Sequence, residues 1–377
     1  MPNCNLRRIF STATCYLLLC LGSTTLPAQH EIPVGESFEV TELIEEAFPL
    51  YGMEDGDKFI DIAANRQQHV SLSNPCIGQD EHFRILPEDE VWLIDARALF
   101  DGGTDLEALK VSQFVDGELV LRSLFDLTIA HASGDSRATM LYVHGNQTDE
   151  EWAVFRGLQV YRNALTTQSE LRAPVRFVIW AWKSESEKLR RYPDFQIKAE
   201  RSMQVGETFA ATLNQFDDHN LIVFSYSLGA QVLLSAFDSP SLICRVSDPS
   251  CYQAIFAAPA INAQFVANHS LRRNETPSII ERSVVFTNQK DRAIRAAQAI
   301  IRRQLPGEES TIEGLSSAGK IQIGQVSAVD LTDEAGRGHR VERYTRSDKL
   351  QRVVAEFVNR SAAKRKQSPL ETHVIQH

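Results

Sequence analysis

The stretch that decides the fold is Leu221-Ile222-Val223-Phe224-Ser225-Tyr226-Ser227-Leu228-Gly229. Its apolar first half is typical of a buried strand, and the run 230–234 that follows is typical of a helix. The turn between them has small side chains at both ends, Ser225 and Gly229. Bulky residues there would collide with the strand or the helix, so the middle residue, Ser227, is pushed out at the end of the strand. The stretch predicts a strand–turn–helix with an accessible serine hydroxyl.

Ser227 has two interpretations. A serine after a strand can cap the next helix by accepting a hydrogen bond from an early amide. It can also be a nucleophile, which needs an adjacent base because a hydroxyl is weakly nucleophilic at neutral pH. The second interpretation requires a histidine and an acid at the ends of other strands, so the rest of the chain decides between the two.

Strand-like and helical patterns alternate after residue 137. The apolar runs lie at 140–143, 175–182, 221–224, 254–257, 284–287 and 321–329. The helical patterns lie at 150–165, 197–216, 228–237, 292–303 and 347–363. Such alternation predicts an α/β protein whose central sheet is mostly parallel and covered by helices on both faces. Two earlier runs, 91–97 and 118–122, are expected to form antiparallel leading strands.

An acid and a histidine follow the later strands. Asp291 comes shortly after the run 284–287, and His339 follows the last strand. Ligands of open α/β sheets bind beyond the carboxyl ends of the strands, where these side chains are expected to meet Ser227. The order serine, acid, histidine predicts a catalytic triad. His339 would take the proton of Ser227, and Asp291 would orient the imidazole and stabilise its charged form.

Each of these residues also has a plainer interpretation. His339 lies in a loop with two nearby glycines, Gly336 and Gly338, and could be an ordinary surface histidine. Asp291 could cap the helix that starts at 292, a common use of aspartate. Asp330 and Asp333 are rival acids, although a loop salt bridge is the simpler expectation for both. The joint occurrence of matches at several strand ends favours the triad.

The turn after the strand 140–143 is the candidate oxyanion site. The backbone N–H groups of Asn146 and Leu228 are predicted to stabilise the oxyanion of a tetrahedral intermediate. Four residues near these turns are predicted to contact the substrate: His144, Gly145, Tyr226 and Trp182. Gly145 would let the backbone approach the substrate closely. For His144 and Trp182, shaping the turn and packing in the core are the respective alternatives.

These motifs resemble the α/β-hydrolase superfamily over about residues 138–358. The chain looks most like uncharacterised bacterial serine hydrolases with a Val-His-Gly oxyanion turn and a small-x-Ser-x-Gly elbow. The matching stretches are 141–146, 177–182, 225–229 and Gly338-His339. The resemblance implies the same roles for the same residues, with Ser227, His339 and Asp291 as nucleophile, base and acid. Ser225 departs from the pattern, which usually has glycine there.

Together these features predict a serine hydrolase that cleaves a small ester, or less readily a thioester or amide, through an acyl-enzyme intermediate. No metal or organic cofactor is expected. The alternative is a non-catalytic α/β-hydrolase-like binding module, which the complete set of three residues disfavours. The acyl and leaving groups stay open because this superfold hosts many chemistries. The oligomeric state stays open as well.

The 377 residues are enough for one large α/β domain with a smaller appendage. A formal net charge of −10 argues against nucleic acid as a partner, because phosphates require a basic surface. The predicted organisation is a signal peptide (1–28), a weakly structured extension (29–90), an α/β-hydrolase domain (91–364) and a charged flexible tail (365–377).

The N-terminal segment predicts export. Arg7 and Arg8 precede the largely apolar run 9–22, and Ala28 is a suitable residue before a cleavage site. The run is short for a transmembrane helix, so a cleaved secretory signal is expected, and no span is expected in the mature chain. Lipid attachment at Cys20 and an uncleaved anchor are the alternatives.

Three cysteines would remain after cleavage, and two of them, Cys244 and Cys251, are close enough in sequence to close a small loop. A disulfide and two free thiols are equally compatible with this spacing. No Cys/His spacing resembles a metal site.

Overall fold

The structure is a computed structural model that describes residues 85–133, 135–186, 191–216, 220–243, 252–261, 280–295 and 325–367. The predictions for the signal peptide, for most of the extension and for the pair Cys244 and Cys251 lie outside the described residues. None of the described helices is long and apolar enough to cross a membrane.

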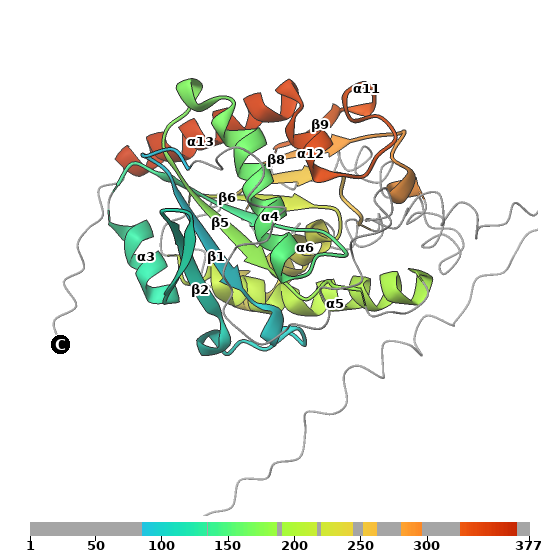
Figure 1. The fold of residues 1–377 in the computed structure, drawn as a ribbon, viewed down its shortest axis with the longest axis horizontal. Helices are drawn as coiled ribbons and strands as arrows, with labels where there is room; N and C mark the ends of the chain where they lie inside the picture. The colour runs from blue at the N-terminus through green and yellow to red at the C-terminus, as the bar shows by residue number, and fades with distance from the viewer. Residues whose placement is uncertain are drawn as a thin grey trace, which may run out of the picture. The chain divides into compact units, whose positions relative to one another are not determined.

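A sheet of nine strands forms the centre of the described part, with the order β3-β2-β1-β5-β4-β6-β7-β8-β9 (Figure 1). The strands are β1 (Glu90–Asp95), β2 (Lys110–Val115), β3 (Glu118–Arg122), β4 (Ala138–Val143), β5 (Val175–Ala181), β6 (Leu221–Tyr226), β7 (Tyr252–Ala257), β8 (Ile280–Thr287) and β9 (Gln325–Asp330). In this order, the seven strands from β1 through β5 and β4 to β9 run parallel to one another. The predicted fold class is confirmed.

The leading edge is antiparallel as predicted, but through a strand that the sequence pattern did not reveal. β2 pairs antiparallel with both β1 and β3, whereas β1 itself pairs parallel with β5, Trp92 lying opposite Val178. β2 reads Lys-Val-Ser-Gln-Phe-Val and has no continuous apolar run, because only one of its residues, Val111, is fully buried. Partial exposure of this edge explains why the strand gives no strong signal.

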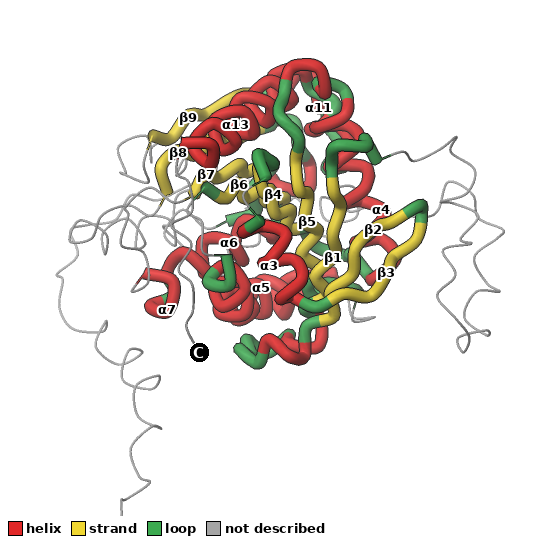
Figure 2. Tube along the Cα trace, turned by 90° about the vertical axis from the view of Figure 1, so that its left-hand side faces the viewer, coloured by secondary structure: helices red, strands yellow, loops and turns green. Residues whose placement is uncertain are grey.

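Helices cover both faces of the sheet (Figure 2). α5 (Arg191–Leu213) and α6 (Gly229–Asp238) pack together on one face, while α4 (Glu150–Val160) and α13 (Asp348–Gln367) lie on the other. The other α-helices of the described part are α3 (Leu124–Ala132) and three shorter ones, α7 (Pro240–Ile243), α11 (Thr332–Ala335) and α12 (Val341–Thr345). One-turn 3₁₀ helices occur at Arg97–Leu99, Leu106–Ala108 and Ser169–Leu171, and a π-helix at Tyr161–Thr166 continues α4.

This covering explains the apolar runs of the sequence. Every residue of β4, β5, β6 and β7 is buried, since strands with helices on both faces have no solvent-exposed side. Arg176 in β5 is the charged exception, and it forms ion pairs with Glu90 at 2.7 Å and Asp135 at 2.9 Å. These partners compensate the buried charge.

The predicted tail begins too early. Residues 365–367 are the last turn of α13 rather than part of a flexible segment. Arg365 donates to the carbonyl oxygen of His131, and Lys364 pairs with Glu281 at 2.7 Å. Basic side chains at a helix C-terminus also interact favourably with the helix dipole, so these charges stabilise the last turn.

A buried ion pair fixes the entry of the chain into the sheet. Asp89 and Arg172 are both almost fully inaccessible and form an ion pair. Asp89 also accepts hydrogen bonds from the hydroxyl of Tyr161 at 2.7 Å and from the backbone N–H of Val175 at 2.8 Å. The carboxylate therefore connects the segment before β1 to the segment before β5.

We expect Asp89→Ala to lower the free energy of unfolding by about 3–5 kcal/mol, because it leaves the guanidinium of Arg172 buried without its carboxylate. Urea unfolding followed by circular dichroism measures this change. The matched control is Asp333→Ala, whose carboxylate pairs with Lys290 on the surface and is 96% exposed. Exposed pairs contribute about 1 kcal/mol or less. Equal effects of the two variants would contradict the assigned role of Asp89.

Candidate active site

The turn after β6 holds Ser227 in a conformation that L-residues rarely adopt, with φ at 53°. Gly229 is required because a Cβ there would lie 2.4 Å from the carbonyl oxygen of Val143. Ser225 occupies the other flank without such a conflict, since its Oγ donates to the carbonyl oxygen of Ile255 at 3.2 Å. A serine in place of the usual glycine is therefore satisfied by hydrogen bonding to the neighbouring strand.

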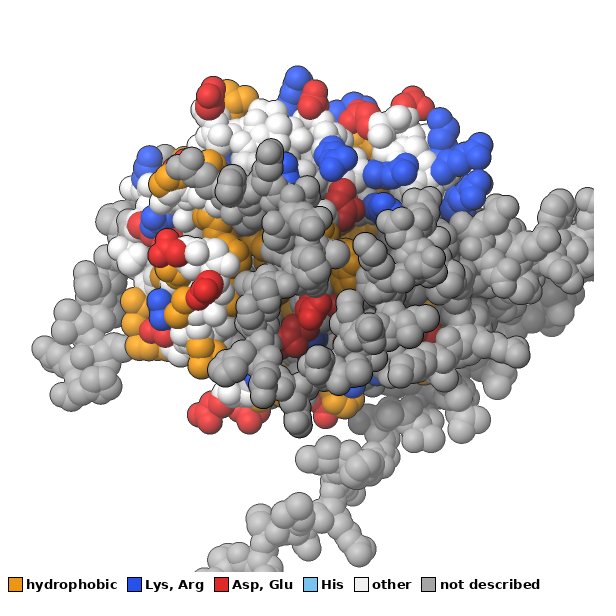
Figure 3. Space-filling model, viewed as in Figure 1, with side chains coloured by type: hydrophobic (Ala, Val, Ile, Leu, Met, Phe, Trp, Pro, Cys, Tyr) orange, Lys and Arg blue, Asp and Glu red, His pale blue; other side chains and the backbone are white. Residues whose placement is uncertain are grey.

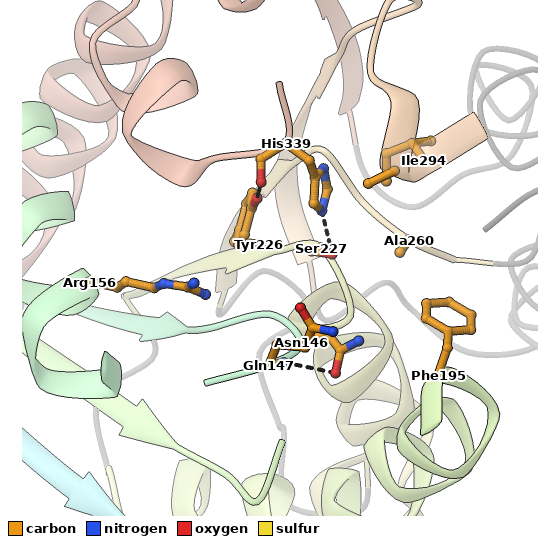
Figure 4. Close-up of a pocket in the computed structure, with 10 residues that line it drawn as sticks. Asn146, Gln147, Arg156, Phe195, Tyr226, Ser227, Ala260, Ile294 and His339 are labelled. Atoms are coloured by element: carbon orange, nitrogen blue, oxygen red, sulfur yellow. Dashed lines mark hydrogen bonds between the residues drawn. The ribbon is translucent and has the colours of Figure 1, made fainter. Parts of the chain in front are cut away.

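The structure brings the three predicted triad residues together (Figure 4). His339 Nε2 lies 2.8 Å from Ser227 Oγ, and His339 Nδ1 lies 2.7 Å from Asp291 Oδ2. The residues come from the turn after β6, the segment after β8 and the loop after α11, which meet at one edge of the sheet. The hydroxyl can donate to Nε2 while Nδ1–H donates to the carboxylate. This arrangement can move a proton from Ser227 to His339.

Asp291 uses its two oxygens for different tasks. Oδ1 accepts from the backbone N–H groups of Ala293 and Ile294, at 3.0 and 3.1 Å, and so caps the helical turn 292–295. Oδ2 accepts from His339 and from the hydroxyl of Tyr344 at 2.6 Å. Asp291 therefore caps a helical turn with one oxygen and bonds His339 with the other.

These contacts keep Asp291 ionised. Burial by itself opposes the charged form, but electrostatic attraction to His339 and the hydrogen bonds from His339, Tyr344 and the Ile294 amide outweigh it, so the pKa of Asp291 lies below its ordinary value. An ionised carboxylate is the form that fixes the tautomer of the imidazole.

The two predicted oxyanion donors are available within the described part of the protein. No described acceptor pairs with the backbone N–H of Asn146 or of Leu228. The turn that carries Asn146 passes close to the nucleophile, since a Cβ on Gly145 would lie 2.8 Å from the Cβ of Ser227. Gly145 therefore allows the backbone contact but offers no side chain to a substrate.

His144 and Trp182 do not line the pocket, in contrast to their predicted substrate contacts. Both side chains are fully buried and stack with ring centroids 5.8 Å apart. His144 Nε2 accepts from the backbone N–H of Trp182 at 3.1 Å, and its Nδ1 lies 2.9 Å from the carbonyl oxygen of Gly145. Because a carbonyl only accepts, Nδ1 carries the proton. The two buried side chains support the oxyanion turn from the core. For His144, shaping this turn is the alternative interpretation of the sequence.

Tyr226 does line the pocket, and it also holds the histidine. Its ring stacks on the imidazole of His339 at a centroid distance of 5.1 Å, and its hydroxyl donates to the carbonyl oxygen of His339. Tyr226 therefore fixes the plane of the imidazole ring and the backbone position of His339.

The pocket around Ser227 has about 440 Å³ of empty space, part of which is open solvent. Its lining includes residues that the motifs did not identify: Gln147, Arg156, Phe195, Ala260, Ala293 and Ile294. Arg156 could have been sought from the sequence, because it follows the oxyanion turn on the predicted helix 150–165. The others depend on how separate loops pack, for which the sequence holds no periodic signal.

The rival acids lie elsewhere. Asp330 accepts hydrogen bonds from Thr332, and Asp333 pairs with Lys290. Neither bonds to His339 in the described part of the chain. Among the same residues, no group of three or more His, Cys, Asp or Glu side chains could hold a metal ion.

Comparison with known proteins matches residues 126–343, more than half of the chain, to a family described as "Alpha/beta hydrolase of unknown function" (DUF900). No curated protein matches the chain. Solved structures with similarity include an esterase of Rhizomucor miehei, at 13% identity and a TM-score of 0.31 over 68% of this chain and 79% of that one. A cutinase of Trichoderma reesei has 13% identity and a TM-score of 0.29, over 63% and 87% of the two chains. An esterase of Thermogutta terrifontis has 14% identity and a TM-score of 0.30, over 59% and 83%. Nothing about activity follows from likenesses at these scores.

We expect His144 to remain neutral far below the ordinary range of histidine. Burial lowers the pKa of His144 to about 3, with the hydrogen bond to Gly145 only partly opposing the shift. A depressed pKa contributes stability above the unfolded value of about 6.5, and this contribution is lost as the pH falls from about 6.5 towards 3. Histidine NMR resonances recorded against pH measure the titration, with the urea-unfolded chain as control. Titration of His144 near its unfolded value would contradict the burial argument.

Proposed function

Because the chain belongs to the DUF900 family of α/β-hydrolases, we propose that it is a serine hydrolase that acts through Ser227, His339 and Asp291. The observation that carries the proposal is the continuous hydrogen-bonded chain from Ser227 Oγ through the imidazole to the carboxylate, at 2.8 and 2.7 Å. A serine that only caps a helix bonds a backbone amide through its Oγ, so the helix-cap interpretation does not account for the bond to histidine.

In the proposed mechanism Ser227 Oγ attacks the carbonyl carbon while its proton passes to Nε2 of His339. The carbonyl oxygen becomes an oxyanion, which the N–H groups of Asn146 and Leu228 stabilise. The imidazolium then gives its proton to the leaving oxygen as the bond to the acyl carbon breaks. A water molecule repeats the sequence on the acyl-enzyme, releasing the acid and restoring the serine. Asp291 stays ionised throughout and stabilises the imidazolium.

An ester of a small molecule is the substrate class that we propose. Apolar side chains such as Phe195 and Ile294 line part of the pocket, beside the polar groups of the oxyanion turn and of the triad. An ester demands less of the general acid His339 than an amide does, because an alkoxide is a better leaving group than an amide nitrogen. Thioester and amide cleavage would use the same residues.

A fluorophosphonate probe tests the nucleophile, because it is attacked by an activated serine and remains attached. We expect the wild type to be labelled and Ser227→Ala to be unlabelled. We expect the labelling rate of His339→Ala to be lower by about 10³-fold or more, since the serine loses its base. In-gel fluorescence of a tagged probe against time measures the rates. The matched control is Ser235→Ala on α6, whose hydroxyl donates to the carbonyl oxygen of Met203 away from the pocket.

Labelling that persists in Ser227→Ala would assign the reaction to another serine. A folded wild-type protein that is not labelled would favour the binding-module alternative over catalysis.

A second experiment concerns the hydroxyl of Tyr344. We expect Tyr344→Phe to slow labelling by about tenfold, because Asp291 loses a charge-assisted hydrogen bond and holds His339 less firmly. The control is Tyr142→Phe, which removes a buried hydroxyl that has no hydrogen-bond partner among the described residues. An unchanged rate in Tyr344→Phe would show that the other contacts of Asp291 suffice.

A further inference from the structure

The backbone N–H of Asn146 belongs to the same peptide unit as the carbonyl group of Gly145. The described part of the chain has no cis peptide bond, so this unit is trans. A trans peptide unit is planar, and its N–H and C=O point in opposite directions. Whatever fixes the direction of the Gly145 carbonyl therefore also fixes the direction of the Asn146 N–H.

Two buried side chains hold the carbonyl oxygen of Gly145. Ser184 Oγ lies 3.0 Å from this oxygen and His144 Nδ1 lies 2.9 Å from it, and both residues are fully buried. The hydroxyl of Thr148 is more distant, at 3.5 Å. No charged side chain of the described residues bonds this oxygen; charged side chains instead lie at the surface, as Figure 3 shows for one face. The two lone pairs of the carbonyl thus have two neutral donors from the core.

Ser184 also contacts the other end of the oxyanion turn. Its Oγ accepts from the backbone N–H of Thr148 at 3.2 Å and lies 3.2 Å from the carbonyl oxygen of Thr148. The hydroxyl has a single proton, and its shorter acceptor contact is the one to Gly145. Between these two ends lies Gln147, with φ at 54°, a value that L-residues rarely adopt. Such a backbone persists where its surroundings over-determine it, and Ser184 connects the two ends of the turn.

The segment after β5 supplies both supports. Trp182 donates its backbone N–H to His144 Nε2 at 3.1 Å and its indole N–H to the carbonyl oxygen of His144 at 2.8 Å. Ser184 follows two residues later and reaches Gly145 directly. The oxyanion turn is therefore held against the end of a buried central strand, through His144 at one point and through Ser184 at another.

These contacts determine where the Asn146 N–H points. The Gly145 carbonyl faces the buried side chains of His144 and Ser184, so the N–H faces away from them, on the side of the pocket that Asn146 lines together with Ser227 (Figure 4). Hydrogen bonds accepted by a carbonyl also polarise its peptide unit and strengthen the N–H as a donor. Oxyanion stabilisation depends on donors that are oriented before the reaction begins.

We propose that Ser184 is a positioning residue of the oxyanion hole. Its hydroxyl holds the carbonyl of Gly145, so that the N–H of Asn146 is directed at the oxyanion that forms when Ser227 attacks a carbonyl carbon. Ser184 itself does not contact the substrate. The inference rests on the proposed hydrolase function and adds a residue that none of the sequence motifs contains.

A pair of ketones tests the proposal. Ser227 would add to 1,1,1-trifluoro-4-phenylbutan-2-one and form a hemiketal whose negative oxygen needs the oxyanion hole, whereas 4-phenylbutan-2-one binds without this addition. We expect Ser184→Ala to raise the Ki of the fluorinated ketone about tenfold and to leave the Ki of the methyl ketone within about threefold, because only the first depends on the directed N–H. For 4-nitrophenyl butanoate, kcat should fall about tenfold with little change in KM.

The pH profile separates this role from damage to the triad. Ser184 has no described contact with His339 or Asp291, so the midpoint of the acidic limb of kcat/KM should be the same in Ser184→Ala and in the wild type. Ser184→Cys is the second variant; it leaves no cavity and replaces the hydroxyl by a weaker donor, so the same difference between the two ketones is expected.

The matched control is Ser361→Ala. Ser361 is also fully buried, and its hydroxyl donates to the carbonyl oxygen of Asn220, which directly precedes β6 at the opposite end of that strand from Ser227. This variant removes a buried serine hydroxyl far from the oxyanion turn. It should keep kcat and both Ki values.

The outcomes separate this inference from the proposed function. A wild type that fluorophosphonate labels, together with unchanged kcat and Ki values in Ser184→Ala and Ser184→Cys, overturns the role of Ser184 and leaves the hydrolase function standing. Equal increases in the two Ki values, or a shifted pH midpoint, also overturn it, because they indicate general damage to the site. A wild type that is neither labelled nor inhibited by the fluorinated ketone overturns the hydrolase function and this inference with it.

Discussion

The close approach of two backbone turns is the constraint on which the site depends. The turn after β6 and the turn after β4 pass so near each other that Gly229 and Gly145 have no room for a Cβ. Hydrogen bonds on both sides hold Ser227 in its unusual conformation: its N–H donates to Ala257 and its carbonyl oxygen accepts from Ala260, each at 3.1 Å. Strained backbone of this kind persists only where its surroundings over-determine it.

Two tyrosines and contacts between the loops after β8 and β9 position the rest of the site around these turns. Tyr226 holds His339 from the elbow, while Tyr344 holds Asp291 from α12. Asn288 adds a direct connection between the two loops, since its side-chain amide donates to the carbonyl oxygen of Gly336 at 2.7 Å. The proton-transfer distances thus depend on contacts between segments that are separated by about fifty residues or more in sequence but adjacent at the edge of the sheet.

The sequence predicts the parts of this site that periodicity and turn chemistry determine. Continuous apolar runs locate β4 to β8, and the residues after them include Ser227, Asp291 and His339. It does not reveal β2, whose residues are half-exposed, nor the burial of His144 and Trp182, which depends on how β5 packs beside β4. Arg156 and Phe195 enter the pocket from helices on opposite faces of the sheet, and only the tertiary arrangement brings them to one site.

Because Asp291 has both a structural contact and a contact with His339, its presence in a related sequence has to be interpreted with care. Its Oδ1 caps the turn 292–295 and its Oδ2 satisfies Tyr344, so an aspartate here stabilises the fold even in a chain that has lost its histidine. A relative that retains the acid alone would keep a scaffold residue rather than a remnant of catalysis. An acid at this position in a relative is therefore weaker evidence for catalysis than a serine and a histidine at the positions of Ser227 and His339.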